Sequence, residues 1–158
     1  DKNIMSLQDP WCYEQHTLGY NYRMSDIQAA LGISQMKRID GFIEKRRAIA
    51  KKYDKEIHSK KITPVHQNQV GVSSYHLYTV KMEPNLRKSL YEYLLENGVG
   101  SQVHYYPIPL QPYYKDLGFK EGAFIDAEEY YSQILSIPIY PSMQEDQVNK
   151  VIGVINGF

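Results

Sequence analysis

Residues 19 to 30 place an aromatic turn directly before the start of a helix: Gly19-Tyr20-Asn21-Tyr22-Arg23-Met24-Ser25-Asp26-Ile27-Gln28-Ala29-Ala30. Ser25 and Gln28 have the S-x-x-Q spacing of a capping box, in which the hydroxyl and the amide each satisfy an unpaired backbone N–H at a helix N-terminus. The sequence therefore predicts a helix that begins near Asp26.

Two polar side chains stand in the turn ahead of this helix. Asn21 can donate two hydrogen bonds and Arg23 up to five, a combination that suits an anionic oxygen such as that of a phosphate. The alternative is structural, with Asn21 bonded to the local backbone and Arg23 paired with a nearby carboxylate. Residue types alone slightly favour the structural alternative.

Downstream of the turn, apolar residues recur at steps of three and four from residue 26 to about residue 57, which is the helical period. The pattern predicts one long helix or two. A bend is expected near Gly41, because glycine weakens a helix by about 1 kcal/mol. The basic run Lys45-Arg46-Arg47 is expected to lie on a solvated outer face.

The rest of the chain alternates strand and helix patterns. Residues 75–82 and 99–106 predict strands, with a helix over residues 84–96 between them. A strand, a helix and a strand in this order form an α/β unit with a right-handed crossover. Two more helices are expected, over residues 127–135 and from a second capping box at Ser142-x-x-Glu145.

Composition and motifs exclude several classes of protein. Eighteen basic and eighteen acidic residues give a formal net charge of zero, so nothing in the charge balance favours nucleic acid or an anionic membrane. No apolar run reaches the length of about 18 residues that a bilayer span needs. Five scattered histidines and one cysteine give no metal-ligand pair, and the phosphate-loop, dinucleotide and nucleophile-turn motifs are absent. We therefore expect no nucleic acid, membrane or metal as a partner.

Several longer strings occur in an order that a known family shares. They are Trp11-Cys12-Tyr13-Glu14, the turn at residues 19–24, Gln28-Ala29-Ala30-Leu31-Gly32, Arg46-Arg47, His76-Leu77-Tyr78, His104-Tyr105-Tyr106-Pro107 and Ser136-Ile137-Pro138-Ile139-Tyr140-Pro141. In these the chain resembles the sugar aminotransferases of the DegT/DnrJ/EryC1/StrS family. The resemblance implies the aspartate aminotransferase fold (fold type I), with residues 1–24 as the end of the large cofactor-binding domain and residues 25–158 as the small carboxyl-terminal α/β domain.

The resemblance also implies a function. Such an enzyme uses pyridoxal 5'-phosphate (PLP) to move an amino group, usually from glutamate, onto a nucleotide-linked 4-keto-6-deoxy sugar, and it works as a cytoplasmic homodimer with a shared active site. The family's Schiff-base lysine lies in a Ser-x-x-x-x-Lys segment that these residues do not contain, so this part is expected to be inactive alone. Two alternatives stay open: a sugar 3-dehydratase with histidine in place of that lysine, and a non-catalytic nucleotide-sugar binding or dimerisation module.

Five residues take site roles by this resemblance. The asparagine of the Asn-Tyr-Arg motif, here Asn21, reaches the phosphate of the neighbouring subunit's PLP. Arg23 serves the same phosphate or the sugar nucleotide's diphosphate, or else forms a structural ion pair. His104 and Tyr105, with Tyr22, are expected to bind the sugar nucleotide, for instance its hydroxyls or an acetamido group. His76 is expected to have a packing role.

Overall fold

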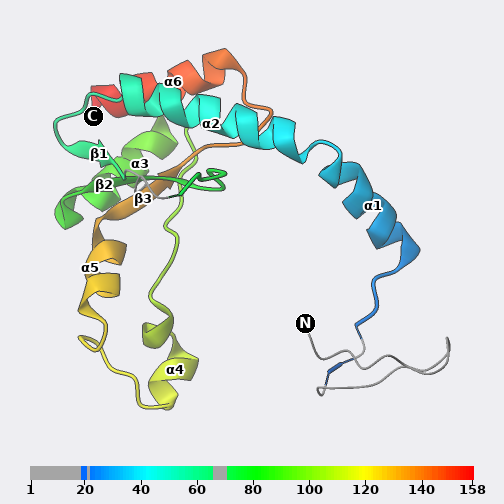
Figure 1. Cartoon of the computed structure of the whole chain (residues 1–158). Helices are drawn as coiled ribbons and strands as arrows, with labels where there is room; N and C mark the ends of the chain where they lie inside the picture. Colours follow the sequence, from blue (N-terminus) through cyan, green and yellow to red (C-terminus); the bar gives the residue numbers. More distant parts are fainter. Residues whose placement is uncertain (1–18, 21, 66–70) are drawn as a thin grey trace, which may run out of the picture. The chain divides into compact units, whose positions relative to one another are not determined.

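The computed structural model describes residues 19–20, 22–65 and 71–158 (Figure 1). The chain divides into two compact units, of which the first ends at Lys37 and the second runs from Arg38 to Phe158. Within the described residues, the first unit contributes helix α1, and the second holds the sheet and the other helices.

Helix α1 spans Asp26–Met36 and begins where the sequence predicts. Ser25 is its N-cap. The capping box is complete, because the Gln28 N–H donates to Ser25 Oγ (3.4 Å) and the Ser25 N–H donates to Gln28 Oε1 (2.9 Å). These reciprocal bonds satisfy backbone donors that a helix start leaves unpaired, so local sequence alone fixes this boundary.

Helix α2 spans Ile39–Glu56, so the long apolar pattern forms two helices. The break lies at Lys37 and Arg38, and the predicted bend near Gly41 is wrong. Arg38 is the N-cap of α2 with a φ of −114°, far from the helical value of about −63°. Gly41 is the third residue of α2, where its cost of about 1 kcal/mol does not interrupt the helix.

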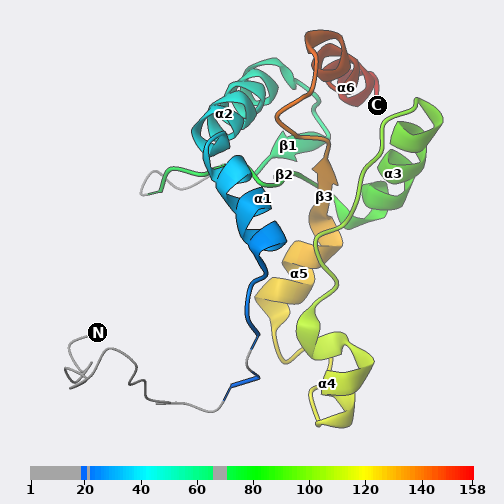
Figure 2. The same cartoon turned by 90° about the vertical axis from the view of Figure 1, so that its right-hand side faces the viewer.

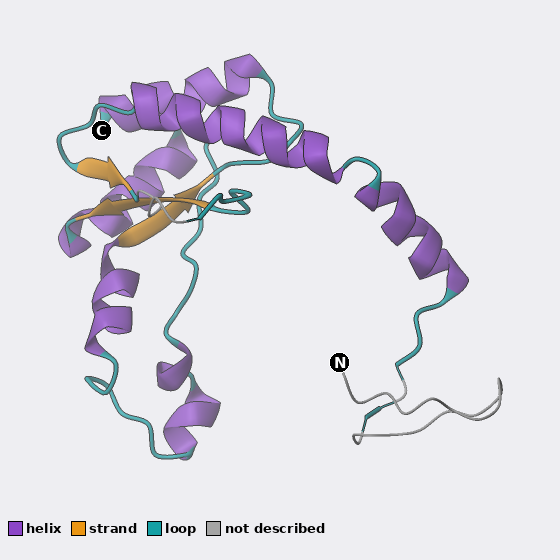
Figure 3. Cartoon of the chain, viewed as in Figure 1, coloured by secondary structure: helices purple, strands orange, loops and turns teal. Residues whose placement is uncertain are grey.

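A three-stranded antiparallel sheet forms the centre of the second unit, in the order β1-β2-β3 (Figure 3). Strand β1 spans Ile62–Pro64, β2 spans Tyr78–Met82 and β3 spans Ile134–Ile137. Val80 lies opposite Pro64 on one side and Leu135 on the other. Pro64 is tolerated because β1 lies at the edge of the sheet.

Two strand boundaries differ from the prediction. Strand β2 begins at Tyr78 instead of residue 75, because Tyr75 has a φ of +48°, which an extended strand does not accommodate. Strand β3 includes Leu135, which was predicted to end a helix. Its four residues are all buried, and a short buried strand cannot be told from a helix by periodicity.

The predicted strand over residues 99–106 is also wrong. In this segment only Gln102 pairs with the sheet, through an isolated antiparallel bridge to Ser136. Since β2 and Gln102 both run antiparallel to β3, the chain at Gln102 runs parallel to β2, as a strand-helix-strand unit requires. However, β3 is inserted between them, which the linear order of the patterns does not reveal.

The remaining helices follow the sequence closely. The 3₁₀ helix η1 (Pro84–Leu86) and helix α3 (Arg87–Glu96) together cover the predicted helix, and Gly98 follows with a φ of +69°. Helix α5 spans Ile125–Gln133 and α6 spans Glu145–Gly157. The predicted Ser142–Glu145 box is wrong, because Ser142 lies in the preceding turn and the box joins Gln144 to Gln147.

One hydrophobic core lies between the sheet and helices α2, α3 and α6. Helices α2 and α6 lie side by side on the same side of the sheet (Figures 1 and 2). The core contains the apolar face predicted for the last helix, and its members come from every one of these elements: Ala50, Tyr53, Ile57, Ile62, Tyr78, Val80, Met82, Leu90, Leu94, Val99, Leu135, Ile137, Ile139, Val148, Val151, Ile152 and Ile155.

Two tyrosines place hydroxyl groups inside this core. The rings of Tyr53 and Tyr78 meet edge to face, with centroids 5.0 Å apart. Tyr53 Oη donates to the Pro138 carbonyl (2.8 Å), and Tyr78 Oη donates to Asp54 Oδ1 (2.6 Å). Burial raises the pKa of both phenols above the ordinary value, and the bond to Asp54 raises the pKa of Tyr78 further.

The segment between the Gln102 bridge and α5 extends away from the sheet (Figures 1 and 2). It contains the 3₁₀ helix η2 (Ile108–Leu110) and helix α4 (Pro112–Asp116). Near its base, Arg87 donates to the Tyr131 carbonyl and stacks over the Tyr131 ring at 4.6 Å. Successive ring contacts join its aromatic side chains, through the pairs Tyr113–Tyr114, Tyr114–Phe119 and Phe119–Phe124.

Candidate functional site

The aromatic turn before α1 carries three of the predicted site residues. Tyr22 is 91% exposed, and its ring stacks on that of Tyr20 with the centroids 5.5 Å apart. Arg23 is also exposed, two residues ahead of the N-cap. Asn21 lies outside the described residues, so its role stays a prediction. The described part of the turn therefore presents aromatic rings and a guanidinium to their surroundings.

A cleft lies beside β3 in the second unit and has a volume of about 350 Å³. Three separate parts of the chain form it, and we call it the β3 cleft. Its lining consists of His76, Leu77, Gly100, Ser101, Gln102, His104, Ser136, Ile137, Pro138 and Ile139. One predicted substrate residue, His104, therefore lines this open cleft.

Backbone bonds and an arginine side chain hold the walls of the β3 cleft together. The Gln102 N–H donates to the Ser136 carbonyl (3.1 Å), and the Ser136 N–H donates to the Gln102 carbonyl (2.8 Å). On the other side, Arg46 Nη1 donates to the carbonyls of His76 (3.1 Å) and Ile139 (2.9 Å). The three wall segments are thus fixed to one another and to α2.

His104 and Tyr105 lie together, as adjacent residues must. The peptide bond between them is cis, and their rings meet edge to face with centroids 4.6 Å apart. Tyr105 is 69% exposed, whereas His104 is half-buried. Within the described part of the chain, two buried polar side-chain atoms have no hydrogen-bond partner, Ser101 Oγ and His104 Nδ1, and both belong to residues that line the β3 cleft.

The structure adds residues that sequence reasoning missed and corrects two interpretations. His76 is exposed, so its expected packing role is wrong. Arg46 and Arg47 do not form a merely solvated face, because both donate to loop carbonyls, Arg47 Nε to Ser73 at 2.8 Å. The sequence feature that could have identified them is that Arg46-Arg47 is one of the strings shared with the aminotransferase family. Ser101 could not be selected from the sequence, because the residues next to it in the chain do not indicate that its hydroxyl is buried.

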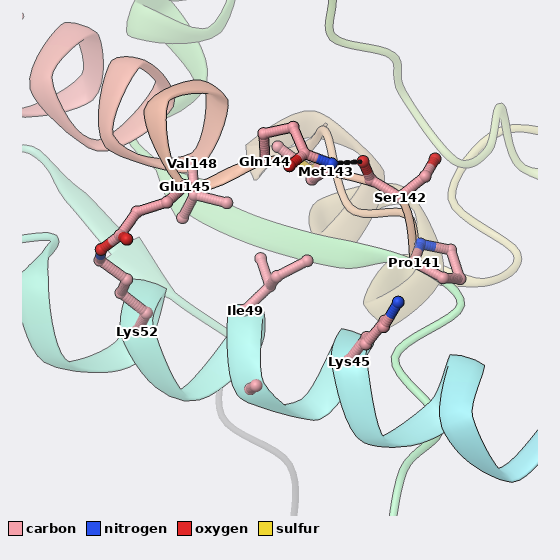
Figure 4. A pocket seen from close by; sticks show the side chains of 10 residues that line it. Lys45, Ile49, Lys52, Pro141, Ser142, Met143, Gln144, Glu145 and Val148 are labelled. Carbon is pink, nitrogen blue, oxygen red and sulfur yellow. Dashed lines mark hydrogen bonds and ion pairs between the residues drawn. The ribbon is translucent and has the colours of Figure 1, made fainter.

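A second hollow, the α2–α6 groove, has a volume of about 480 Å³ (Figure 4). Ile49 and Val148 contribute its apolar floor. Lys52 Nζ forms an ion pair with Glu145 Oε1 at 3.1 Å, and Lys45 points toward Pro141 (Figure 4). None of the predicted site residues lies in this groove.

The structure also bears on membranes and metals. Among the described residues, no helix combines the length and apolar character that crossing a bilayer would demand. In the same part of the chain, histidine, cysteine and carboxylate side chains do not gather in threes around a position where a metal ion could bind.

Comparison with known proteins identifies the family of this chain. The model of the DegT/DnrJ/EryC1/StrS aminotransferase family matches residues 5–156. The spore coat polysaccharide biosynthesis protein SpsC of Bacillus subtilis is 37% identical over 97% of this chain and 41% of its own length. The UDP-4-amino-4,6-dideoxy-N-acetyl-beta-L-altrosamine transaminase of Campylobacter jejuni is 39% identical over 84% of this chain and 36% of its own length.

A solved structure of a sugar aminotransferase has the same fold as this chain. The putative sugar aminotransferase Spr1654 of Streptococcus pneumoniae, in its PMP form, superposes with a TM-score of 0.82 at 29% identity, covering 93% of this chain and 38% of that one. The chain spans about two fifths of the length of the curated relatives it matches. The α/β fold of this chain is that of part of the sugar aminotransferases of known structure. The chain belongs to the DegT/DnrJ/EryC1/StrS aminotransferase family.

Proposed function

We propose that this chain is the carboxyl-terminal part of a PLP-dependent aminotransferase that moves an amino group from glutamate to the keto group of a nucleotide-linked 4-keto-6-deoxy sugar. The observation that carries the proposal is the family match over nearly the whole chain, together with 39% identity to a relative named as an amino-sugar transaminase. A relative named for spore coat polysaccharide biosynthesis supports a role in making surface polysaccharides or nonulosonic acids. The complete enzyme would be a cytoplasmic homodimer.

The turn before α1 offers donors that fit the phosphate of PLP. Arg23 is exposed and carries a charged, multiply donating guanidinium, which suits a phosphate oxygen. The capping box already occupies the Gln28 N–H, and Asp26 adds negative charge to the first turn of α1. The phosphate would therefore be held by side chains, Arg23 and Asn21, more than by that helix start.

The other proposed contacts concern the sugar nucleotide. Tyr22 and Tyr105 are exposed aromatic side chains with a polar tip, which suits the face and hydroxyls of a sugar. His104 lines the β3 cleft with an unpartnered ring nitrogen. When bound, PLP would supply the electron sink for chemistry at the substrate carbon. The lysine that moves the proton there would come from outside these residues.

The full-length protein that contains this chain provides the direct test. It is incubated with ¹⁵N-glutamate and with UDP-linked and GDP-linked 4-keto-6-deoxy sugars, and the masses of the products are measured by mass spectrometry. Transfer of one ¹⁵N to the sugar with one 2-oxoglutarate formed is the expected result. A product that has lost the C3 hydroxyl and carries no ¹⁵N would instead identify a dehydratase. Sugar-nucleotide binding without conversion and without borohydride-trapped PLP would identify a binding module.

The shared active site has its own test. An Asn21→Ala subunit and a subunit without the cofactor lysine should each be impaired, and mixing them should restore activity. In the mixed dimer, one site then combines an intact lysine with an intact Asn21 from the other subunit. A mixture no more active than its parts would show that Asn21 acts within its own subunit or not at all.

A further inference from the structure

A further hollow lies where the residues that follow α3 meet α6, and we call it the α3–α6 pocket. It has a volume of about 380 Å³ and is lined by residues 98–100, by the connection from β3 to α6, and by α6 itself. Val99 and Val151 form apolar parts of the lining and are 3% and 4% exposed. Both belong to the hydrophobic core, so this part of the lining is in place without a ligand.

Three hydrogen-bond donors line the same pocket. Gln147 and Lys150 lie three residues apart on α6, which places them on one face of that helix. Tyr140 Oη lies 3.5 Å from Gln147 Oε1, so the phenol and the amide are neighbours. Gln147 Oε1 also accepts from the Gln144 N–H (2.9 Å), which leaves the Nε2 hydrogens of Gln147 for another acceptor. All three donor residues are accessible, Tyr140 at 39% and the other two as exposed residues.

The ammonium group of Lys150 lies against Gly98, which also lines the pocket. A methyl group added at Gly98 would come within 2.9 Å of Lys150 Nζ, so the glycine leaves space that the ammonium occupies. Asp146 precedes Lys150 by one turn of α6, at the spacing that favours an ion pair. Among the described residues, however, Lys150 forms no ion pair with Asp146 or with any other carboxylate. Its positive charge is therefore available to a bound group.

The chemistry of the lining defines the class of that group. The pocket offers three donors, one of them charged, and no aspartate or glutamate is among the described residues that line it. A cation would meet a like charge there, and a wholly apolar molecule would leave the donors unpaired. A carboxylate joined to a short apolar body would pair with Lys150 and cover Val99 and Val151, in the manner of small-molecule sites that combine apolar walls with a few polar groups.

We propose that the α3–α6 pocket binds a small organic carboxylate, with its charge on Lys150, its apolar body on Val99 and Val151, and Tyr140 as a second donor. None of these residues has a proposed role in binding PLP or the sugar nucleotide. The inference therefore goes beyond the proposed aminotransferase function and does not depend on it.

Binding is tested on the full-length protein that contains this chain, with benzoate as the probe. Acetate has the charge without the ring, and benzyl alcohol has the ring without the charge, so these two are the comparisons. Saturation-transfer NMR should show that benzoate binds most tightly of the three, and the methyl signals of Val99 and Val151 should shift as benzoate is added. No binding of benzoate, equal affinity for benzoate and either comparison, or shifts that avoid both valines would overturn the proposal.

Variants of the charged residue locate the carboxylate. Lys150→Gln should weaken benzoate binding by about two- to fivefold and leave benzyl alcohol unaffected, whereas Lys150→Arg keeps the charge and should bind benzoate nearly as the parent does. Lys51→Gln is the matched control, because Lys51 is exposed on α2 and lies outside the pocket lining. An equal loss in Lys51→Gln and Lys150→Gln would show a general attraction of anions and refute the site.

A second variant tests the phenol. Tyr140→Phe keeps the ring and removes only the hydroxyl, and it should weaken benzoate binding by about two- to tenfold. All these variants should melt within about 2 °C of the parent, because the substituted groups lie at the surface, so lost binding cannot be attributed to unfolding. Unchanged affinity in both Tyr140→Phe and Lys150→Gln would place benzoate elsewhere and overturn the proposal.

Discussion

Replacing Arg46 with methionine removes the contacts that join α2 to two loops of the second unit. Arg46 Nη1 lies 3.1 Å from the Tyr75 carbonyl, 3.1 Å from the His76 carbonyl and 2.9 Å from the Ile139 carbonyl. Methionine keeps much of the aliphatic stem but supplies no donor. We expect the variant to fold with a less stable second unit and a loosened β3 cleft.

The size of the loss follows from the geometry. A hydrogen bond with one charged partner contributes about 1.5–3 kcal/mol to stability. Nη1 carries only two hydrogens, so three carbonyls share two bonds. The shortest goes to Ile139, which is buried, and we assign it about 2 kcal/mol. The second is shared between Tyr75 and the exposed His76 and adds about 1 kcal/mol, for a total near 3 kcal/mol.

Urea unfolding of the chain, followed by circular dichroism, measures this loss. Arg47→Met is the matched control, because Arg47 bonds the carbonyls of Ser73 (2.8 Å) and Val72 (3.5 Å) in an exposed loop, and it should cost less than about 1 kcal/mol. Equal losses in the two variants, or a loss below about 0.5 kcal/mol for Arg46→Met, would refute the idea that Arg46 holds the cleft walls.

Three further predictions follow from local features. Ser25→Ala should cost α1 about 1 kcal/mol, seen as faster amide exchange confined to that helix; unchanged exchange would contradict the capping role. Because the folded-state pKa values of Tyr53 and Tyr78 are raised, their stability contribution is full below the unfolded pKa of about 10 and is lost above it. Each tyrosine should remove about 1.4 kcal/mol per pH unit above pH 10, a slope that Tyr53→Phe should halve in a pH series of urea melts. Gly98→Ala should cost about 1 kcal/mol by thermal melting, mainly because of its positive φ, since only the flexible end of Lys150 lies near the added methyl group; no loss would show that the left-handed conformation is not required.

Sequence patterns located the helices well because their signals are local. The capping box at Ser25 fixed the start of α1, and the apolar spacing of Val148, Val151, Ile152 and Ile155 identified the buried face of α6. The strands were harder. Ile134–Ile137 has no alternation because every residue is buried, and Tyr75 leaves the strand pattern through a backbone angle that a tyrosine rarely adopts.

The candidate site was predictable only where the chain resembled a family. His104 was selected for that reason, and the structure places it in the β3 cleft. The burial of the Ser101 hydroxyl and the bond from Arg46 to the Ile139 carbonyl both arise where segments distant in sequence meet. Such contacts depend on which segments meet, and this information is not carried by residue type or spacing.

The insertion of β3 between β2 and the Gln102 bridge has a consequence for how the protein is made. During synthesis β2 emerges before the strand that completes its hydrogen bonding, which follows only after α3, α4 and α5. Until then β2 has an open edge available to other chains, which is a risk for aggregation. The sheet of the second unit therefore cannot be completed until β3 has left the ribosome.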